Sequence, residues 1–230
     1  MGANREVARG RPTVQVSLDF STLDDAMVAA RAAVSAGVDW LEAGTPLVVS
    51  EGLAAVRTMR AEFPDTPIVV DLKTMDGGYG AAMRTADAGG SWVVIMARSH
   101  PATVEGAVRA GKESGIGVMV DLMMVEDKPA AARRLEEMGV DLIVLHHGVD
   151  ARTADGGTVL DDVAAVRPAV SVPLQAVGGL SRDELLRLPS LGVESVVVGQ
   201  PLLSYAHADP AAIADVIGGV VRDVRQASAG

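Results

Sequence analysis

Several residue types are absent or scarce in this chain. It contains no cysteine, which excludes a disulfide scaffold, a thiolate metal site and a cysteine nucleophile. Its formal net charge is −10, so no overall basic field is available to hold nucleic acid. The longest apolar run, Trp92 to Ala97, is far shorter than the ~18 residues that a membrane helix needs. We therefore expect neither nucleic acid nor a membrane as a partner.

The chain has 230 residues, of which 49% are hydrophobic and 25 are glycine. This apolar fraction excludes a disordered chain, and the length suits one domain or two small ones. Residues 1–12 are polar and charged, and they contain no apolar stretch typical of a signal peptide. We expect residues 1–12 to be a polar tail, residues 13–230 to form a single domain, and the protein to be cytoplasmic.

A short phrase recurs four times along the chain. It reads AGVDW at 36–40, AGGSW at 88–92, MGVDL at 138–142 and LGVES at 191–195. Each copy follows a stretch rich in helix-forming residues and precedes an apolar, mostly β-branched run. The glycine suits the left-handed position that ends a helix. The phrase therefore predicts a helix, a glycine stop and a strand.

Four further apolar runs lie between the copies, at 13–18, 67–70, 116–120 and 172–177. Together they predict eight strands that alternate with helices. Continuous apolar runs are typical of parallel strands covered on both faces. Eight evenly spaced β-α units in a chain of this length predict a closed (β/α)8 TIM barrel. An open doubly wound sheet is the structural alternative, but it does not require so even a repeat.

Nearly every predicted strand ends in a polar residue or in glycine. In such barrels the chemistry lies at the carboxyl ends of the strands. Charged groups directly after buried runs are costly unless they are paired or bind something. We therefore expect a functional site at this end of the barrel. The strand-end residues are Asp19, Glu42, Asp71, Lys73, Arg98, Asp121, His146, His147, Gly178, Gly179, Gly199 and Gln200.

The segment DLKTMDGG, at 71–78, is the densest of these ends. Asp71 and Lys73 are two residues apart, so in extended chain they point the same way. They predict either a structural salt bridge, with Asp76 as a helix cap, or a charge relay that keeps Lys73 protonated. A protonated lysine there can stabilise an enolate or hold a substrate hydroxyl.

Glu42 and Asp71 end adjacent strands, so their oxygens can meet around one ion. Oxygen ligands suit Mg²⁺, or alternatively Mn²⁺. The simpler alternative for Glu42 is a charge partner of Lys73. Alternation along the sixth strand sends either His146 or His147 into the barrel, where an acid–base role is favoured.

The last two strands end in glycine. Backbone N–H groups at these two loops form the common phosphate site of such barrels. We therefore expect Gly178, Gly179 and Gly199, with Gln200, to bind a substrate phosphate.

Six motifs, in this order, resemble 3-hexulose-6-phosphate synthase of the orotidine 5′-monophosphate decarboxylase suprafamily, which also holds 3-keto-L-gulonate-6-phosphate decarboxylase. The resemblance runs from about Val14 to Pro210. EAGTPL joined to DLKTMD, and H-x-G-x-D at 146–150, are its most specific parts. The motifs are LEAGTPL, DLKTMDGG, VDLMMVEDK, LHHGVD and AVGGL, preceded by LDF in the first strand.

The resemblance implies a role for each matching residue. Glu42 and Asp71 would be Mg²⁺ ligands, and Asp19 and Lys73 would contact substrate. His146 would move protons at an enediolate, and Asp121 occupies the acidic position of the fifth strand. Asp76 would reach into the partner's site across a homodimer interface, which places the active site at that interface. The reaction implied is an aldol condensation of formaldehyde with ribulose 5-phosphate, giving 3-hexulose 6-phosphate.

Three positions depart from the family pattern. Gln200 stands where synthases usually have Gly and the decarboxylase branch tends to have Arg. Arg98 ends the fourth strand where synthases have Gly. Val149 stands where the decarboxylase branch carries Arg, which disfavours decarboxylation. Two alternatives to the aldolase remain: a decarboxylase of a 3-keto-hexonate 6-phosphate that uses the same enediolate, and a barrel that binds a sugar phosphate without turnover.

Overall fold

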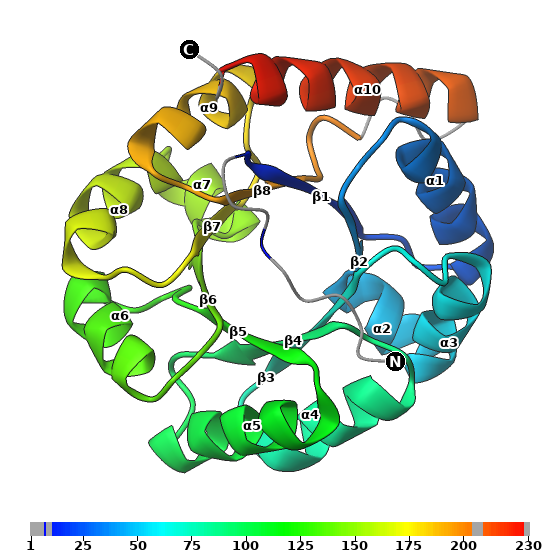
Figure 1. The fold of residues 1–230 in the computed structure, drawn as a ribbon. Coiled ribbons are helices and arrows are strands. Elements are labelled where there is room, and N and C mark those ends of the chain that lie inside the picture. Colours follow the sequence, from blue (N-terminus) through cyan, green and yellow to red (C-terminus); the bar gives the residue numbers. More distant parts are fainter. Residues whose placement is uncertain (1–6, 8–10, 204–208, 228–230) are drawn as a thin grey trace.

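Eight parallel strands close into a barrel in the computed structural model, which describes residues 7, 11–203 and 209–227 (Figure 1). Each strand pairs with the next in sequence, and β8 pairs with β1. This last pairing confirms the predicted (β/α)8 barrel, because a doubly wound sheet has two open edges. The strands are β1 (Thr13–Leu18), β2 (Trp40–Ala43), β3 (Ile68–Thr74), β4 (Trp92–Met96), β5 (Gly117–Asp121), β6 (Leu142–His146), β7 (Leu174–Val177) and β8 (Ser195–Val198).

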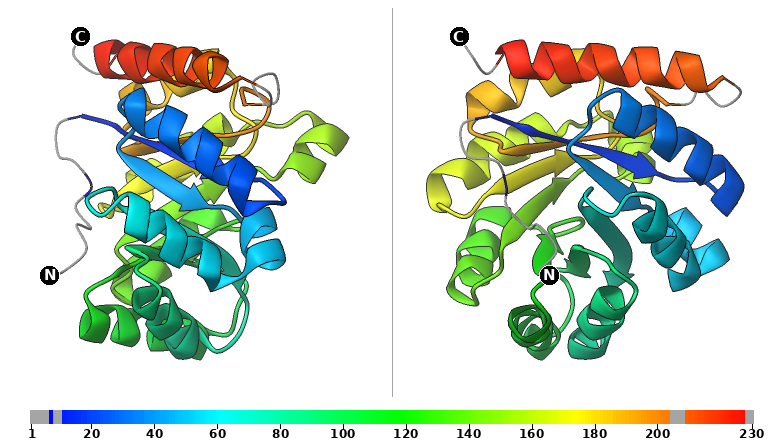
Figure 2. Two further views of the ribbon diagram at one scale, coloured as in Figure 1. Left: turned by 90° about the vertical axis from the view of Figure 1, so that its right-hand side faces the viewer. Right: turned by 45° about the vertical axis from the view of Figure 1, so that its right-hand side comes forward.

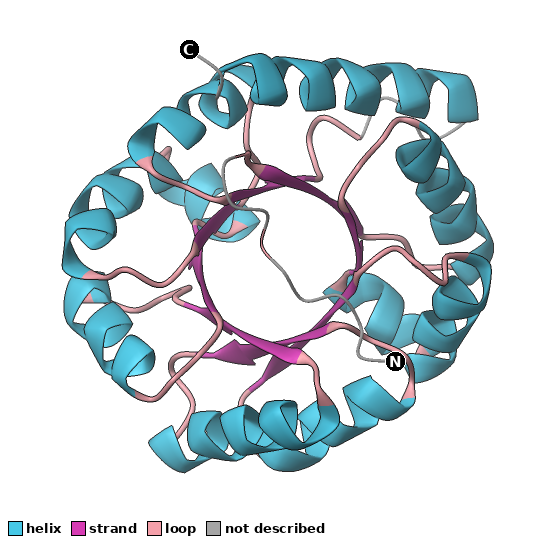
Figure 3. Ribbon diagram, viewed as in Figure 1, coloured by secondary structure: helices cyan, strands magenta, loops and turns pink. Residues whose placement is uncertain are grey.

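Helices surround the barrel and cover the outer face of its strands (Figure 3). Two of them, α1 and α10, lie side by side although they are far apart in sequence (Figure 2). The helices are α1 (Leu23–Ser35), α2 (Thr45–Glu51), α3 (Leu53–Glu62), α4 (Gly78–Asp87), α5 (Pro101–Ser114), α6 (Lys128–Glu137), α7 (Val149–Asp155), α8 (Val159–Val166), α9 (Arg182–Arg187) and α10 (Pro210–Ala227).

Two parts of the predicted organisation need separate mention. The polar tail predicted over residues 1–12 lies mostly outside the described residues. Within the described part of the chain, every helix is too short or too polar to cross a membrane.

The four repeat glycines end their segments as predicted. Each has a positive φ of 80–87°, a conformation that costs glycine little. In each copy the residue after the glycine donates its N–H to the carbonyl five residues earlier, which is the Schellman arrangement. The donor and acceptor pairs are Val38 and Ala33, Gly90 and Thr85, Val140 and Leu135, and Val193 and Leu188.

In each copy, the polar residue two positions after the glycine links two strands. Its side chain accepts a hydrogen bond from the first or second backbone N–H of the preceding strand, at 2.8–3.1 Å. Each copy therefore fastens the strand before it to the strand that it begins. These bonds lie at the amino-terminal end of the barrel. The acceptors and donors are Asp39 and Val14, Ser91 and Ile68, Asp141 and Val118, and Glu194 and Leu174.

The barrel interior is a packed core and not a pore. Trp40 and Trp92 fill its amino-terminal half, with ring centroids 5.1 Å apart. Val69, Met119 and Leu142 pack around them, and each of these side chains is buried. The carboxyl half carries polar side chains instead, and the candidate site lies there.

Replacing Ser91 by alanine tests the repeat contact. The Oγ atom accepts from Ile68 N and Arg60 Nη2, and both donors lose this acceptor in Ser91→Ala. We expect a loss of about 1–3 kcal/mol in the free energy of unfolding, measured by urea denaturation. Ser190→Ala removes an exposed serine and should change stability by less than about 0.5 kcal/mol. Equal effects of the two substitutions would contradict this reading of the repeat.

Candidate active site

The carboxyl ends of the strands surround a cavity of about 720 Å³. All eight strands, or the residues directly after them, contribute to its lining. The structure therefore brings together most of the residues singled out in the sequence. Those that line the cavity are Asp19, Glu42, Asp71, Lys73, Asp121, His146, Gly178, Gly179, Gly199 and Gln200.

Asp76 is the residue with an implied catalytic role that does not line the cavity. It is exposed, lies outside the cavity lining, and accepts a hydrogen bond from the backbone N–H of Gly77 at 2.8 Å. The alternative that it caps a helix is wrong, because Gly77 occupies the N-cap of α4 without a side-chain cap. Within one chain, Asp76 has no part in the cavity.

Lys73 and Asp71 form an ion pair, with 2.6 Å between Lys73 Nζ and Asp71 Oδ2. The two side chains do not meet because the backbone is extended, so the prediction of extended chain from Asp71 to Lys73 is wrong. The pairing register shifts between Val70 and Thr74, and Lys73 has a φ of +42°. Such a conformation is uncommon for a non-glycine residue and persists only where its surroundings hold it. Here Asp71 Oδ1 accepts from Lys73 N, and Thr45 Oγ1 donates to Asp71 Oδ2 at 2.8 Å.

Three carboxylates, of Asp19, Glu42 and Asp71, raise the negative potential of the cavity. Burial, with the charges of Asp71 and Asp19, raises the pKa of Glu42 to about 8. Desolvation also raises the pKa of Asp19, against a hydrogen bond from Ser17 that lowers it. Burial alone would lower the pKa of Lys73, but the adjacent Asp71 carboxylate outweighs it and raises that pKa. Lys73 is therefore held as a cation.

A chain of polar side chains supports Glu42 from inside the barrel. Gln15 Nε2 donates to Glu42 Oε2, and Gln175 Nε2 donates to Gln15 Oε1 at 2.9 Å and to Ser195 Oγ at 2.8 Å. When Glu42 is ionised its carboxylate only accepts, which gives these amides one orientation. Sequence analysis missed Gln15 and Gln175, although a glutamine inside an apolar strand is a signal of a buried polar contact.

The donor set fits a divalent cation of the magnesium type. Carboxylates that repel one another and lack a full counter-charge favour a cation between them. Mg²⁺ is usually bound through one or two carboxylates, with water or substrate oxygens completing its shell. The described residues hold no group of three or more His, Asp or Glu arranged for a metal. Glu42 and Asp71 would therefore hold the ion together with oxygens from outside the chain.

His146 is the histidine of the sixth strand that faces the cavity. Its Nδ1 lies 2.7 Å from Asp121 Oδ2, and Asp121 Oδ1 accepts from Met123 N at 2.7 Å. An ionised Asp121 fixes the proton on Nδ1, which leaves Nε2 able to accept one. His147 pairs instead with Asp155, at 3.0 Å.

The two glycines after β7 adopt conformations that favour glycine. Gly178 has a φ of +115° and Gly179 a φ of +61°. A Cβ on Gly178 would lie 2.0 Å from the carbonyl oxygen of His147, so the close approach here is to the end of β6. Arg98 lies outside the cavity lining and donates to the carbonyl of Met124 at 2.9 Å.

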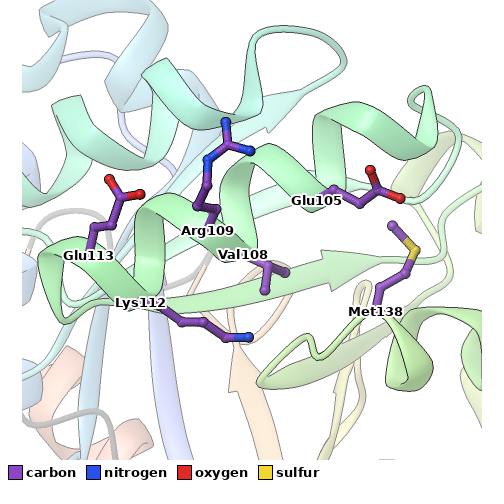
Figure 4. Close-up of a pocket in the computed structure, with 6 residues that line it drawn as sticks. All are labelled: Glu105, Val108, Arg109, Lys112, Glu113 and Met138. Carbon is purple, nitrogen blue, oxygen red and sulfur yellow. The ribbon is translucent and has the colours of Figure 1, made fainter.

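A second hollow, of about 400 Å³, lies on the outer face of α5 near α6. Figure 4 shows its charged side chains spaced along one helix, with Arg109 and Lys112 pointing in different directions. They do not converge on a common point, so this hollow is a poor candidate for chemistry. Its lining consists of Glu105, Val108, Arg109, Lys112, Glu113 and Met138.

The chain is similar to proteins of known name over most of its length. Residues 12–216 match the model of the "Orotidine 5'-phosphate decarboxylase / HUMPS family". The 3-hexulose-6-phosphate synthase of Methylomonas aminofaciens is 33% identical, over 90% of this chain and 96% of that protein. The synthase of Bacillus subtilis (strain 168) is 30% identical, over 84% of this chain and 91% of that protein.

Solved structures give the same result. The 3-hexulose-6-phosphate synthase of Salmonella typhimurium superposes with a TM-score of 0.83 at 33% identity, covering 92% of this chain and 99% of that one. KGPDC from Streptococcus mutans, in complex with D-R5P, superposes with a TM-score of 0.82 at 26% identity, covering 93% and 98%. These similarities confirm the resemblance predicted from the motifs.

The raised pKa of Glu42 predicts an unusual pH dependence of stability. Between about pH 4.5 and pH 8 the folded chain keeps a proton that the unfolded chain releases. In EDTA, this group therefore makes the free energy of unfolding fall as pH rises, by at most about 1.4 kcal/mol per pH unit. Glu42→Gln removes the effect, so denaturation should show the variant more stable than wild type at pH 8, with a smaller difference at pH 5.

An exposed glutamate provides the control for this prediction. Glu126 is exposed, and Glu126→Gln should change stability little at either pH. A Glu42→Gln protein that is less stable than wild type at pH 8 would show that burial does not disfavour the charged carboxylate.

Proposed function

Because the chain belongs to the orotidine 5′-phosphate decarboxylase / HUMPS family, we propose that it is a Mg²⁺-dependent lyase that joins formaldehyde and ribulose 5-phosphate into 3-hexulose 6-phosphate. Relatives that carry the name 3-hexulose-6-phosphate synthase, at about 30% identity over most of the chain, support this reaction. The observation that carries the proposal is that the Asp121–His146 pair and the Asp71–Lys73 pair line one cavity.

The Asp121–His146 pair would transfer the proton, and the Asp71–Lys73 pair would stabilise the negative charge that forms. His146 Nε2 would take a proton from C1 of ribulose 5-phosphate, and Asp121 would stabilise the imidazolium that results. The electron pair left behind delocalises as an enediolate, whose oxygen would accept a hydrogen bond from protonated Lys73. The C1 carbon then forms a bond to the carbon of formaldehyde, the C=O bond of formaldehyde opens, and its oxygen takes up the proton that His146 Nε2 holds, which returns His146 to its starting state.

Two further groups complete the proposed site. Mg²⁺, or Mn²⁺, held by Glu42 and Asp71 would supply positive charge that stabilises two adjacent substrate oxygens. Asp19 would contact the substrate from the end of β1. The amides of Gly178, Gly179, Gly199 and Gln200 would bind the phosphate, and D-R5P in the Streptococcus mutans KGPDC supports a sugar phosphate as ligand.

Decarboxylation of a 3-keto-hexonate 6-phosphate is the second candidate. The apolar side chain of Val149 favours the aldol reaction over it. Val149 lines the cavity and is 61% exposed, so this position offers no cation to a substrate carboxylate. A cytoplasmic location, and the absence of nucleic-acid and membrane partners, stay predictions.

Formaldehyde consumption is the direct test of the proposed reaction. With ribulose 5-phosphate and Mg²⁺ present, the protein should consume formaldehyde, EDTA should stop the reaction and added Mg²⁺ should restore it. His146→Asn should lower kcat by about 10²–10⁴-fold, the usual contribution of a general base. His147→Asn is the matched control and should keep its activity, since His147 pairs with Asp155 outside the proposed chemistry.

Two other results would replace the proposal. Release of CO₂ from 3-keto-L-gulonate 6-phosphate without formaldehyde consumption would make the chain a decarboxylase. Binding of sugar phosphates with no turnover of any would make it a binding protein.

We also propose a homodimer whose interface lies at the mouth of the barrel. Asp76 is exposed, and two large side chains close to it in sequence, Met75 and Tyr79, are exposed as well. Such exposure favours contact with a second protein chain. Asp76 would then enter the partner's cavity.

Mixing two inactive variants tests this arrangement. Asp76→Ala and Lys73→Ala should each be nearly inactive. After mixing and subunit exchange, a heterodimer holds one intact site, so about a quarter of the wild-type activity should return, measured by the formaldehyde assay. A fully active monomer in sedimentation experiments, or no recovery on mixing, would contradict a shared site.

A further inference from the structure

Arg152, on α7, joins two segments that meet at the carboxyl end of β7. Its Nη1 and Nη2 atoms donate to Glu184 Oε1 and Oε2 at 3.2 and 2.9 Å. Its Nη1 atom also donates to the backbone carbonyl of Gly178, at 3.3 Å. The two-pronged arrangement is the strongest and most directional form of an arginine–carboxylate contact.

Glu184, in the first turn of α9, is the centre of this contact. It is 8% exposed and also accepts from Thr158 Oγ1 at 2.6 Å, Ser181 N at 2.8 Å and Ser181 Oγ at 2.7 Å. Burial alone would raise the pKa of Glu184, but Arg152 and these donors lower it to about 2. A single charged carboxylate therefore fastens α7, the start of α8 and the start of α9 to one another.

The segment enclosed by these contacts is the Gly178–Gly179 loop. Ser181 lies two residues beyond it, and Arg152 reaches its other end at the Gly178 carbonyl. Arg152 Cδ lies 3.3 Å from the position that a Cβ of Gly179 would occupy, so its side chain packs against the loop. Two adjacent glycines have large conformational freedom, and a loop that binds through its amides gains from being held beforehand.

We propose that Arg152 and Glu184 are positioning residues for substrate phosphate, because they hold the Gly178–Gly179 amides in the geometry that binds it. The proposal rests on the proposed function, since it assigns the phosphate to this loop. Arg152 is absent from the cavity lining, so it acts through the loop and not as a phosphate ligand itself. The neutral side chain of Gln200 makes the chain more dependent on well-placed amides.

A second arginine–glutamate pair, at the other end of β7, supplies a matched control. Arg167 Nη1 donates to Glu194 at 3.2 Å, and its guanidinium also donates to the carbonyls of Val170 and Val172. Glu194 in turn accepts from Leu174 N, at the start of β7. The Arg167 pair thus braces the starts of β7 and β8, at the opposite end of the barrel from the cavity, whereas the Arg152 pair contacts the loop after β7.

Comparing Arg152→Ala with Arg167→Ala separates positioning from general stability. Both should lower Tm, because each removes an ion pair and backbone contacts. Only Arg152→Ala should weaken binding of ribulose 5-phosphate and of inorganic phosphate in calorimetry. We expect about tenfold, which corresponds to about 1.4 kcal/mol. It should raise the KM for ribulose 5-phosphate to a similar extent, with little change in kcat or in the KM for formaldehyde.

Conservative variants keep the test decisive if Arg152→Ala does not fold. Arg152→Lys keeps the charge but loses the two-pronged contact, and Glu184→Gln keeps the side-chain size but loses the charge. Each should raise the same KM by a smaller factor than Arg152→Ala.

Three outcomes would overturn the proposal: equal changes in phosphate affinity for Arg152→Ala and Arg167→Ala, a loss in kcat alone, or a wild-type protein that binds no phosphate. Phosphate binding without aldol activity would overturn the proposed reaction only, and the comparison of affinities would still decide the positioning role.

Discussion

Repulsion among Asp19, Glu42 and Asp71 is the interaction to which the rest of the cavity responds. A closed parallel barrel brings every strand end to one rim, so residues that are distant in sequence share one small volume. Three carboxylates there, with Glu42 buried enough to raise its pKa to about 8, would be unfavourable without compensation. Compensation comes from Lys73 at 2.6 Å from Asp71, from Thr45 and from the amide of Gln15.

This compensation has a conformational cost. Lys73 reaches Asp71 only with a left-handed backbone and a shift in the register of β3. Strain of this kind, of order 1–3 kcal/mol, persists where surrounding structure over-determines it. Here the Asp71 carboxylate accepts from both the backbone N–H and the Nζ of Lys73, and Thr45 Oγ1 donates to the same carboxylate. The opposite end of the barrel is braced separately, by the four repeat acceptors at the starts of the odd-numbered strands and by the two tryptophans.

Local patterns in the sequence were sufficient to predict much of this arrangement. The repeat predicted the barrel because helix-ending glycines and apolar runs are local signals, and polar residues directly after those runs pointed to the cavity. Local patterns do not say which distant residues pair in the tertiary structure. Arg152 and Glu184 are 32 residues apart. Gln15 and Gln175 are 160 residues apart, and only barrel closure brings them together. The conformation of Lys73 was also missed, because the spacing of Asp71 and Lys73 is compatible with ordinary extended chain.

The two ends of the barrel also explain why the repeat is visible in the sequence at all. At the amino-terminal end, each even-numbered strand follows a helix, and the polar residue before it accepts one N–H from the preceding strand. A glycine and a polar residue two positions later meet this need in all four copies. At the carboxyl end the strands deliver several kinds of group: carboxylates from β2, β3 and β5, an imidazole from β6 and backbone amides from the loop after β7. The amino-terminal contacts can therefore repeat along the chain, whereas the strand ends differ because they place different groups around one cavity. The two arginine–glutamate pairs show the same contrast at the two ends of β7, since Glu194 belongs to the repeat and the Arg152–Glu184 pair contacts the loop that borders the cavity.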